Sequence, residues 1–208
     1  MSDIKYATED YSKTYLPLMK TALENSLEFN FNNKPRISIT EKIDQNLLEF
    51  IAVKIEQNLI PHLLRIHPTY WGNSCQLLSS HIFAYLASKG IDAEIVYGEV
   101  EINGTLEFDT TLQGLKREFH ASPPLAGGQA LHAWVSLGGD IIIDAAIPDR
   151  MIKLYQFPSE QLPLFLIGRA SELSRTFRTR YQPLLVGTDF LARTNPPDPL
   201  KLVEYYSE

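Results

Sequence analysis

The chain has 208 residues, enough for one sizeable hydrophobic core, and its 44% hydrophobic and 21% charged residues are typical of a globular protein. Its net charge of -6 disfavours nucleic acid and anionic membranes as partners. The single cysteine excludes an intrachain disulfide and a cysteine-rich metal site, and we expect neither a cofactor nor a bound metal. The amino end lacks the basic and apolar regions of a signal peptide, and no apolar run is long enough to span a membrane, so we expect a cytoplasmic protein.

The amino-terminal part, residues 1–68, is predicted to be helical. Apolar residues at helical spacing predict a helix within residues 10–30. Ser38-Ile39-Thr40-Glu41 has the form of a capping box, which predicts that a second helix begins there. We expect that helix to kink at Pro61 and to end at His67-Pro68.

The stretch from Tyr70 to Ala87 places the only cysteine where a loop becomes a helix. Trp71-Gly72-Asn73-Ser74 indicates the loop, and the helix is predicted from apolar residues spaced by three and four, which are Leu78, Ile82, Tyr85 and Leu86. Cys75 is therefore expected at the amino end of this helix, where the helix dipole and unpaired N–H groups favour a thiolate. A lone cysteine is more often a small buried hydrophobic residue, so its chemistry depends on a nearby base.

A β-rich segment follows that helix. Residues 91–102 are predicted to form a strand, and Asn103-Gly104 predicts a two-residue hairpin that returns through residues 105–109. Residues 111–119 are read as a short helix. Residues 121–130 are predicted to form a loop, and Gly127-Gly128-Gln129 within it is read as a connection rather than a mobile flap. We expect the segment from Thr105 to Ala130 to shape substrate specificity.

Two strands are predicted around Gly138-Gly139-Asp140, at residues 131–137 and 141–146. With a two-residue loop, His132 and Asp144 would project from opposite sides of the sheet. With a three-residue loop, Leu137 faces Ile141, Trp134 pairs with Asp144, and His132 lies diagonally from Asp144 on the same face. We predict the three-residue version, because the two glycines supply the left-handed positions that such a turn needs.

The carboxyl-terminal segment carries weaker signals. Residues 159–168 are read as a short helix that Pro163 interrupts, and residues 172–185 as a long strand. Its three arginines are expected on a solvated face rather than against an anionic substrate, and they are Arg175, Arg178 and Arg180. Residues 195–199 are rich in proline and are expected to be extended.

A cysteine at the start of a helix, followed by a histidine in one strand and an aspartate in the next, resembles the transglutaminase-like branch of the papain-like cysteine enzymes. The resemblance rests on the approach to Cys75, the helix end Leu86-Ala87-Ser88-Lys89-Gly90-Ile91-Asp92-Ala93, His132-Ala133-Trp134 and Ile142-Ile143-Asp144-Ala145. Two positions depart from the family pattern. Gln76 stands where the family has an aromatic residue, and Ala145-Ala146 where Pro-Thr is common.

This resemblance implies an α+β fold in which the cysteine helix packs on an antiparallel sheet, with extra helices at the amino end. It implies a single domain. Residues 1–68 form its helical part, residues 69–147 its catalytic core, and residues 148–208 an extension that completes the fold.

The resemblance also implies a role for each reactive residue. The Cys75 thiolate attacks a carbonyl carbon, His132 moves the proton, and Asp144 orients the imidazole ring. The backbone N–H of Cys75 is one oxyanion donor, and the second is either the Trp71 indole or the Asn73 amide. Trp134 is a further candidate for contacting the substrate.

Other residues rank below these three. His81 lies about 120° round the helix from Cys75 and should not reach it. His120 precedes a Pro-Pro loop with no acid just downstream. Asp140 is expected in the turn, and Asp149 beyond the strand.

The expected function is hydrolysis of an amide or peptide bond through an acyl-thioester, with a peptide, a protein, or a small amide or thioester as substrate. One alternative is a transglutaminase-like domain that only binds a partner, with an inert thiol. A second is an acyltransferase with an amine acceptor. The sequence leaves the substrate, the acceptor and the oligomeric state open.

Overall fold

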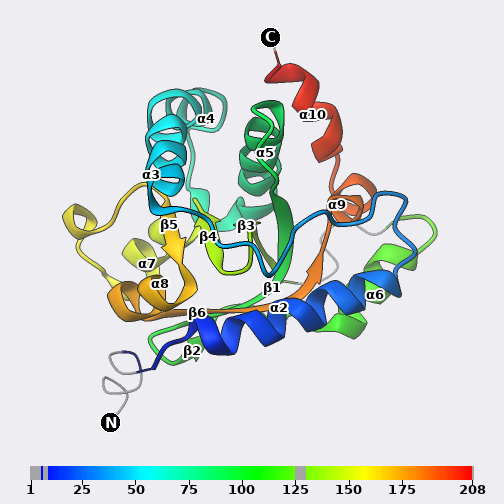
Figure 1. Ribbon diagram of the computed structural model, residues 1–208, viewed down its shortest axis with the longest axis horizontal. Helices are drawn as coiled ribbons and strands as arrows, with labels where there is room; N and C mark the ends of the chain where they lie inside the picture. Colours follow the sequence, from blue (N-terminus) through cyan, green and yellow to red (C-terminus); the bar gives the residue numbers. More distant parts are fainter. Residues whose placement is uncertain (1–5, 7–8, 125–129, 208) are drawn as a thin grey trace.

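The computed structural model describes residue 6, residues 9–124 and residues 130–207. It is an α+β structure with a curled antiparallel sheet and helices against both faces (Figure 1). The strands are β1 (Glu94–Ile102), β2 (Thr105–Leu106), β3 (His132–Leu137), β4 (Ile141–Asp144), β5 (Leu166–Arg169) and β6 (Thr179–Val186). Their order is β2-β1-β3-β4-β5, with β6 pairing with β1.

The sheet separates two groups of apolar side chains, because neighbouring residues of a strand point to opposite faces. On one face, Ile95 and Tyr97 of β1 pack in the same cluster as α5 (Cys75–Ser88). On the other face, Val96 and Val100 pack in the same cluster as α2 (Ser12–Leu27). Helix α2 runs along β6 in Figure 1 and confirms the helix predicted within residues 10–30.

The turn between β3 and β4 has the predicted register. Leu137 pairs with Ile141, so the loop has three residues, Gly138-Gly139-Asp140. Gly138 has a φ of +52°, a conformation that glycine adopts without strain. A Cβ atom on Gly139 would lie 2.2 Å from the carbonyl oxygen of Ile39, so the turn also lets the amino-terminal segment pack closely.

The predicted Asn103-Gly104 hairpin is confirmed, since Ile102 pairs with Thr105 and both turn residues have positive φ. The returning strand is shorter than predicted and ends at Leu106 rather than residue 109. The Phe108 N–H donates to the Glu99 carboxylate (2.7 Å), so the chain leaves the ladder there. Helix α6 (Leu112–His120) follows, as predicted.

The predicted capping box at Ser38 is wrong. The Ser38 hydroxyl bonds the Thr40 hydroxyl (3.1 Å), and the helix begins later, at α3 (Gln45–Lys54). Asp44 caps α3 by accepting the Asn46 N–H (2.7 Å). The first N–H groups of a helix have no partner within the helix, and the Asp44 carboxylate lies close enough to accept one of them, whereas Ser38 lies too far along the chain.

A kink was expected at Pro61, and the structure has a π-helical turn just before it, η1 (Ile55–Leu59), between α3 and α4 (Ile60–Ile66). Proline has no N–H to donate and crowds the preceding turn, so the helix widens before it. Helix α4 ends before His67-Pro68, as predicted.

The carboxyl-terminal predictions are mostly wrong. Residues 159–168 contain only the 3-10 turn η3 (Ser159–Gln161) and the start of β5. The predicted strand over residues 172–185 is instead helix α8 (Ala170–Phe177) followed by β6. The Glu172 carboxylate accepts the Arg169 N–H (3.2 Å) at the helix start, and left-handed Arg178 ends the helix.

Arg180 does not lie on a solvated face, although Arg175 and Arg178 are exposed. Its side chain is buried, lies over the rings of Tyr6 and Tyr11, and bonds Glu9 (2.7 Å). The remaining helices are α7 (Ile147–Tyr155), α9 (Asp189–Thr194) and α10 (Pro199–Tyr205). In the part of the chain that the structure describes, no helix is both long and apolar enough to cross a membrane.

Candidate active site

Helix α5 begins at Cys75, and only Ser74 separates it from the 3-10 turn η2 (Trp71–Asn73). Buried Trp71 anchors this turn. Its indole N–H donates to the His67 carbonyl (2.9 Å), and its backbone N–H donates to the Asp149 carboxylate (2.9 Å). The Ser74 hydroxyl bonds the His67 ring (2.7 Å). These contacts fix the chain just before the cysteine.

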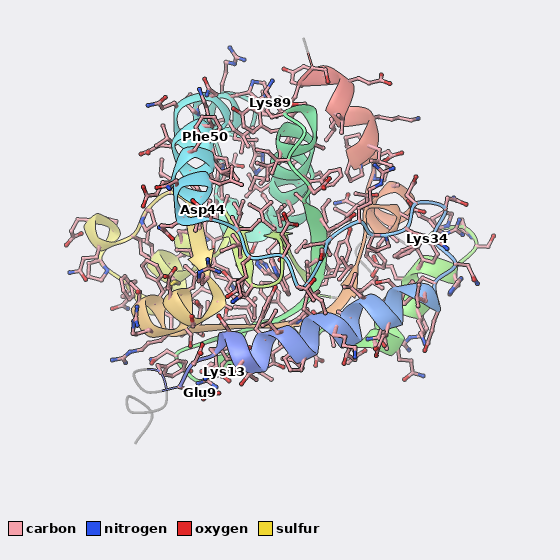
Figure 2. All side chains as sticks on the ribbon, viewed as in Figure 1. Glu9, Lys13, Lys34, Asp44, Phe50 and Lys89 are labelled. Carbon is pink, nitrogen blue, oxygen red and sulfur yellow. The ribbon has the colours of Figure 1, made fainter. Side chains whose placement is uncertain are left out.

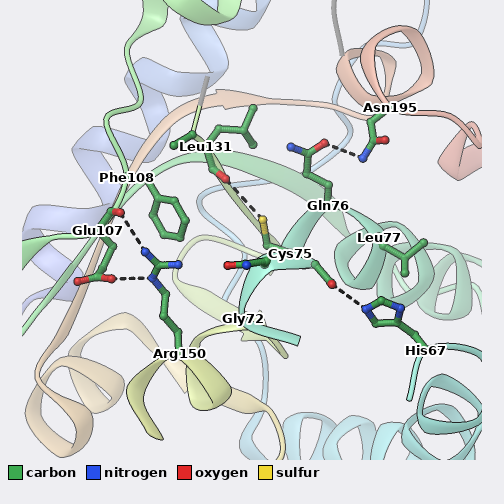
Figure 3. Close-up of a pocket in the computed structure, with 13 residues that line it drawn as sticks. His67, Gly72, Cys75, Gln76, Leu77, Glu107, Phe108, Leu131, Arg150 and Asn195 are labelled. Carbon is green, nitrogen blue, oxygen red and sulfur yellow. Dashed lines mark hydrogen bonds and ion pairs between the residues drawn. The ribbon is translucent and has the colours of Figure 1, made fainter. Parts of the chain in front are cut away.

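Helix α5 lies against β3, and two side chains of its buried face contact the backbone of β3 and of the residue just before it. The Ser79 hydroxyl donates to the Ala133 carbonyl (2.9 Å). The Cys75 thiol donates to the Leu131 carbonyl (3.5 Å), as Figure 3 shows. Cys75 is only 6% exposed, yet it lines a cavity.

His132 and Asp144 form a buried pair, with 2.5 Å between Nε2 and Oδ2. The register of β3 and β4 puts both residues on one face of the sheet. The Phe108 ring stacks on the imidazole with centroids 4.9 Å apart, and the Trp134 ring lies nearly parallel to it at 5.9 Å. The ring therefore has little freedom to turn.

Asp144 accepts hydrogen bonds at both oxygen atoms. Oδ1 accepts the N–H groups of Ala146 (2.8 Å) and Ile147 (3.2 Å), where α7 begins. Oδ2 accepts the Tyr181 hydroxyl (3.0 Å) as well as His132. Four donors and the amino end of a helix compensate a buried negative charge at this position.

The pKa of His132 reflects opposing effects. Burial disfavours the charged ring, but the charge and hydrogen bond of Asp144, and then the nearby Cys75 side chain, outweigh it and raise the pKa above the ordinary 6.5. Nε2 is bonded to Asp144, and Nδ1 has no hydrogen-bond partner among the described residues. Nδ1 is therefore the atom left to exchange a proton with the thiol.

The cavity that Cys75 lines has a volume of about 550 Å³ (Figure 3). Side-chain amides of Asn73, Gln76 and Asn195 stand on its wall beside α5. On the other side, Arg150 bonds the Glu107 carboxylate (2.6 Å), and its guanidinium lies 4.6 Å from the Phe108 ring centroid. The walls carry both apolar and polar side chains, and Arg150 and Glu107 neutralise each other, so the cavity suits an uncharged group with polar atoms.

Of the other candidate residues, only Asn73 is placed to contact a substrate. Asn73 is exposed and lines the cavity. The Trp71 indole N–H is already bonded to His67, so Asn73 remains the side-chain oxyanion candidate. Trp134 is fully buried, and its indole N–H donates to the Tyr15 hydroxyl (3.1 Å). Trp134 is therefore a core residue beneath His132 rather than a substrate contact.

The lower-ranked residues lie elsewhere. His81 bonds the Tyr206 hydroxyl (2.7 Å), and His120 stacks on Phe29. Asp140 pairs with Arg169 (2.9 Å), and Asp149 holds the Trp71 backbone. Within the described ranges, no group of three or more His, Cys, Asp or Glu side chains is placed to hold a metal ion.

Sequence reasoning missed Tyr181 and the residues that hold Phe108 over His132. Glu99 Oε1 accepts the N–H groups of Val100, Glu107 and Phe108, which fixes the turn that carries Phe108. The only signal in the sequence for this turn was a glutamate directly after Gly98 in a β-rich segment. Tyr181 had no such signal, because β6 reaches the site only through its pairing with β1.

Comparisons of the chain with family models, with curated proteins and with solved structures found no match. Its function therefore has to be inferred from the geometry of this site.

Proposed function

We propose that this chain is a cysteine-dependent acyl-transfer enzyme with a transglutaminase-like, papain-like core, and that it hydrolyses an amide or peptide bond. The observation that carries the proposal is the buried His132–Asp144 pair next to Cys75, the cysteine that lines the 550 Å³ cavity. A nucleophile, a base and a group that orients the base are the three parts of this chemistry.

In the reactive form, the thiol proton has moved from Sγ to Nδ1 of His132, which leaves a thiolate beside an imidazolium and agrees with the raised pKa of the ring. Sγ attacks the carbonyl carbon of the substrate, and the electron pair of the C=O bond moves onto its oxygen. The N–H groups of the first turn of α5 have no intrahelical partners, so they stabilise this oxyanion together with the Asn73 amide.

The intermediate then collapses. The oxyanion re-forms the C=O bond, the C–N bond breaks, and the imidazolium gives its proton to the leaving amine. The acyl-thioester on Cys75 is attacked by water, whose proton passes to Nδ1. The second collapse releases the carboxylic acid and the thiolate, and His132 returns the proton.

Burial supports catalysis over a purely structural role for the pair. His132 and Asp144 are 0% and 1% exposed, and removing two ionisable groups from water costs several kcal/mol per ion. Apolar residues of similar size would fill this part of the core at lower cost. A retained pair beside a cysteine that lines a cavity is consistent with a reaction that needs a charged imidazole.

One observation favours the alternative of a binding domain without activity. The thiol bonds a backbone carbonyl, and Nδ1 is unbonded, so the reactive pair is not joined in this conformation. An amine in place of water would give the second alternative, an acyltransferase. The substrate classes are a peptide, a protein, or a small amide or thioester.

Acyl-enzyme trapping tests the proposal. The chain is mixed with p-nitrophenyl acetate and quenched in acid, and the intact mass is measured. We expect one acetyl group on Cys75, formed much faster than on free cysteine at the same pH, and none in Cys75→Ser. Acetylation of Cys75 no faster than that of free cysteine would contradict an activated thiol.

A further inference from the structure

A second cavity, of about 520 Å³, lies between α3 and the carboxyl end of α5, away from Cys75. Its lining is mostly apolar. The apolar residues come from α3, from α5 and from the segment just after α5, and they are Leu47, Phe50, Ile51, Tyr85, Leu86 and Ile91. It shares no lining residue with the cavity at Cys75. We call it the α3–α5 groove.

The α3–α5 groove exposes large apolar side chains. Phe50 is 54% exposed and Leu47 is 41% exposed, both on α3. Exposed apolar residues gathered around a concave site, rather than scattered singly, mark a place where a ligand is bound. The volume lies in the range of small-molecule sites, roughly 300–1,000 Å³.

Two lysines stand at the groove, and both lie over its aromatic rings. Lys54 Nζ is 5.4 Å from the Phe50 ring centroid, and Lys89 Nζ is 5.7 Å from that of Tyr85. Lys89 also donates to the Tyr206 carbonyl (3.1 Å), which fixes its ammonium group. Figure 2 shows Phe50 and Lys89 on the same side of the molecule.

The charge around the groove has one sign. None of the described residues that line it is acidic, whereas Lys54 and Lys89 both contribute a positive charge. This is unusual on a chain whose net charge is -6. An apolar floor with cations at its edge is complementary to a ligand with an apolar body and one anionic end.

We propose that the α3–α5 groove binds a small amphiphilic anion, namely an aliphatic carboxylate of the fatty-acid type. The hydrocarbon chain lies between α3 and α5 on Leu47, Phe50 and Leu86. The carboxylate is held at the edge by Lys54 and Lys89. This site is separate from the proposed acyl-transfer site and does not depend on it.

The test is calorimetric titration of the full chain with dodecanoate below its micelle concentration. The double variant Lys54→Gln with Lys89→Gln removes the cations, and Phe50→Ser removes part of the apolar floor. Lys13→Gln is the matched control, because Lys13 is 82% exposed on α2, far from the groove (Figure 2). All three variants are at exposed positions, and unchanged thermal unfolding verifies their folding.

We expect one molecule of dodecanoate per chain, at least tenfold weaker binding in the lysine double variant and in Phe50→Ser, and no change in Lys13→Gln. The absence of binding to the wild-type chain would overturn the proposal, as would equal binding by all variants. A concentration-dependent dimer that Phe50→Ser dissociates, without dodecanoate binding, would overturn it in favour of a second copy of the chain.

Discussion

Asp144 is the residue through which the candidate site is held together. It joins β4, the start of α7, the imidazole of β3 and the Tyr181 hydroxyl of β6. Its sequence neighbours are apolar, so a carboxylate here needs partners in the fold. The sequence predicted one of these partners, His132, from the β3–β4 register. It did not predict Tyr181, because that contact depends on a strand more than thirty residues away.

Removing the carboxylate should cost more stability than removing one of its donors. Asp144→Ala leaves buried His132 and two N–H groups without their acceptor, and we expect a loss of about 3–5 kcal/mol. Tyr181→Phe removes one hydrogen bond to a charged group and keeps the ring, and we expect about 1.5–3 kcal/mol. Denaturant unfolding measures both. Equal losses of stability in the two variants would contradict this order and show that the Tyr181 hydroxyl contributes more than one hydrogen bond to Asp144.

The raised pKa of His132 predicts a pH dependence of stability. The folded state binds the proton more tightly than the unfolded chain, so the pair stabilises the fold fully below pH 6.5. That contribution should decline as the pH rises from 6.5 to about 10. The measurement is the free energy of unfolding of the wild type minus that of His132→Gln. A difference that stayed constant or grew over this range would contradict a charged imidazole.

Among the elements, β1 determines where β6 lies. Between Tyr97 and Gly98 the register with β6 shifts, and Leu184 is left without a partner in β1. Gly98 permits this bulge, because its α-carbon lies against the backbone of Gln182. Without this approach, β6 would not bring Tyr181 to Asp144.

Gly98→Ala should therefore destabilise the protein strongly. The added Cβ would lie 2.1 Å from the Gln182 carbonyl oxygen, so the two strands must separate, and we expect a loss of about 3 kcal/mol or more. Gly168→Ala in β5 is the control, since its Cβ would meet its nearest neighbour, Leu173, at 3.4 Å. The measurement is the thermal unfolding of both variants, which compares the stability lost at Gly98 with that lost at Gly168. A loss at Gly168 as large as that at Gly98 would contradict the close approach.

Elements with strong local signals were predictable, and those set by tertiary contacts were not. Gly138, Asn103 and Gly104 have positive φ, a backbone conformation that few other residues adopt, so the registers at these two turns could be derived. Residues 172–185 carry apolar positions that fit a strand as well as a helix. The Glu172 contact fixes the start of α8, and the left-handed Arg178 ends the helix just before β6 begins.

At the scale of the whole molecule, the carboxyl-terminal third completes the sheet that carries the site. Strand β6 pairs with β1, and α2 covers β6, so both ends of the chain pack around the central strands (Figure 1). The resemblance to a transglutaminase-like core covered residues 69–147 only. Tyr181 and the Asn195 side chain on the cavity wall come from outside that range.

The most direct test of the account is the rate at which iodoacetamide labels Cys75 as a function of pH, in the wild type and in His132→Ala. With a single cysteine, the label reports one site. Circular dichroism verifies that the variant folds, and His132→Gln replaces it if it does not. We predict labelling at neutral pH much faster than that of free cysteine, and loss of this rate when His132 is replaced. Slow labelling with an ordinary pH dependence, unchanged by the substitution, would contradict the proposed enzyme.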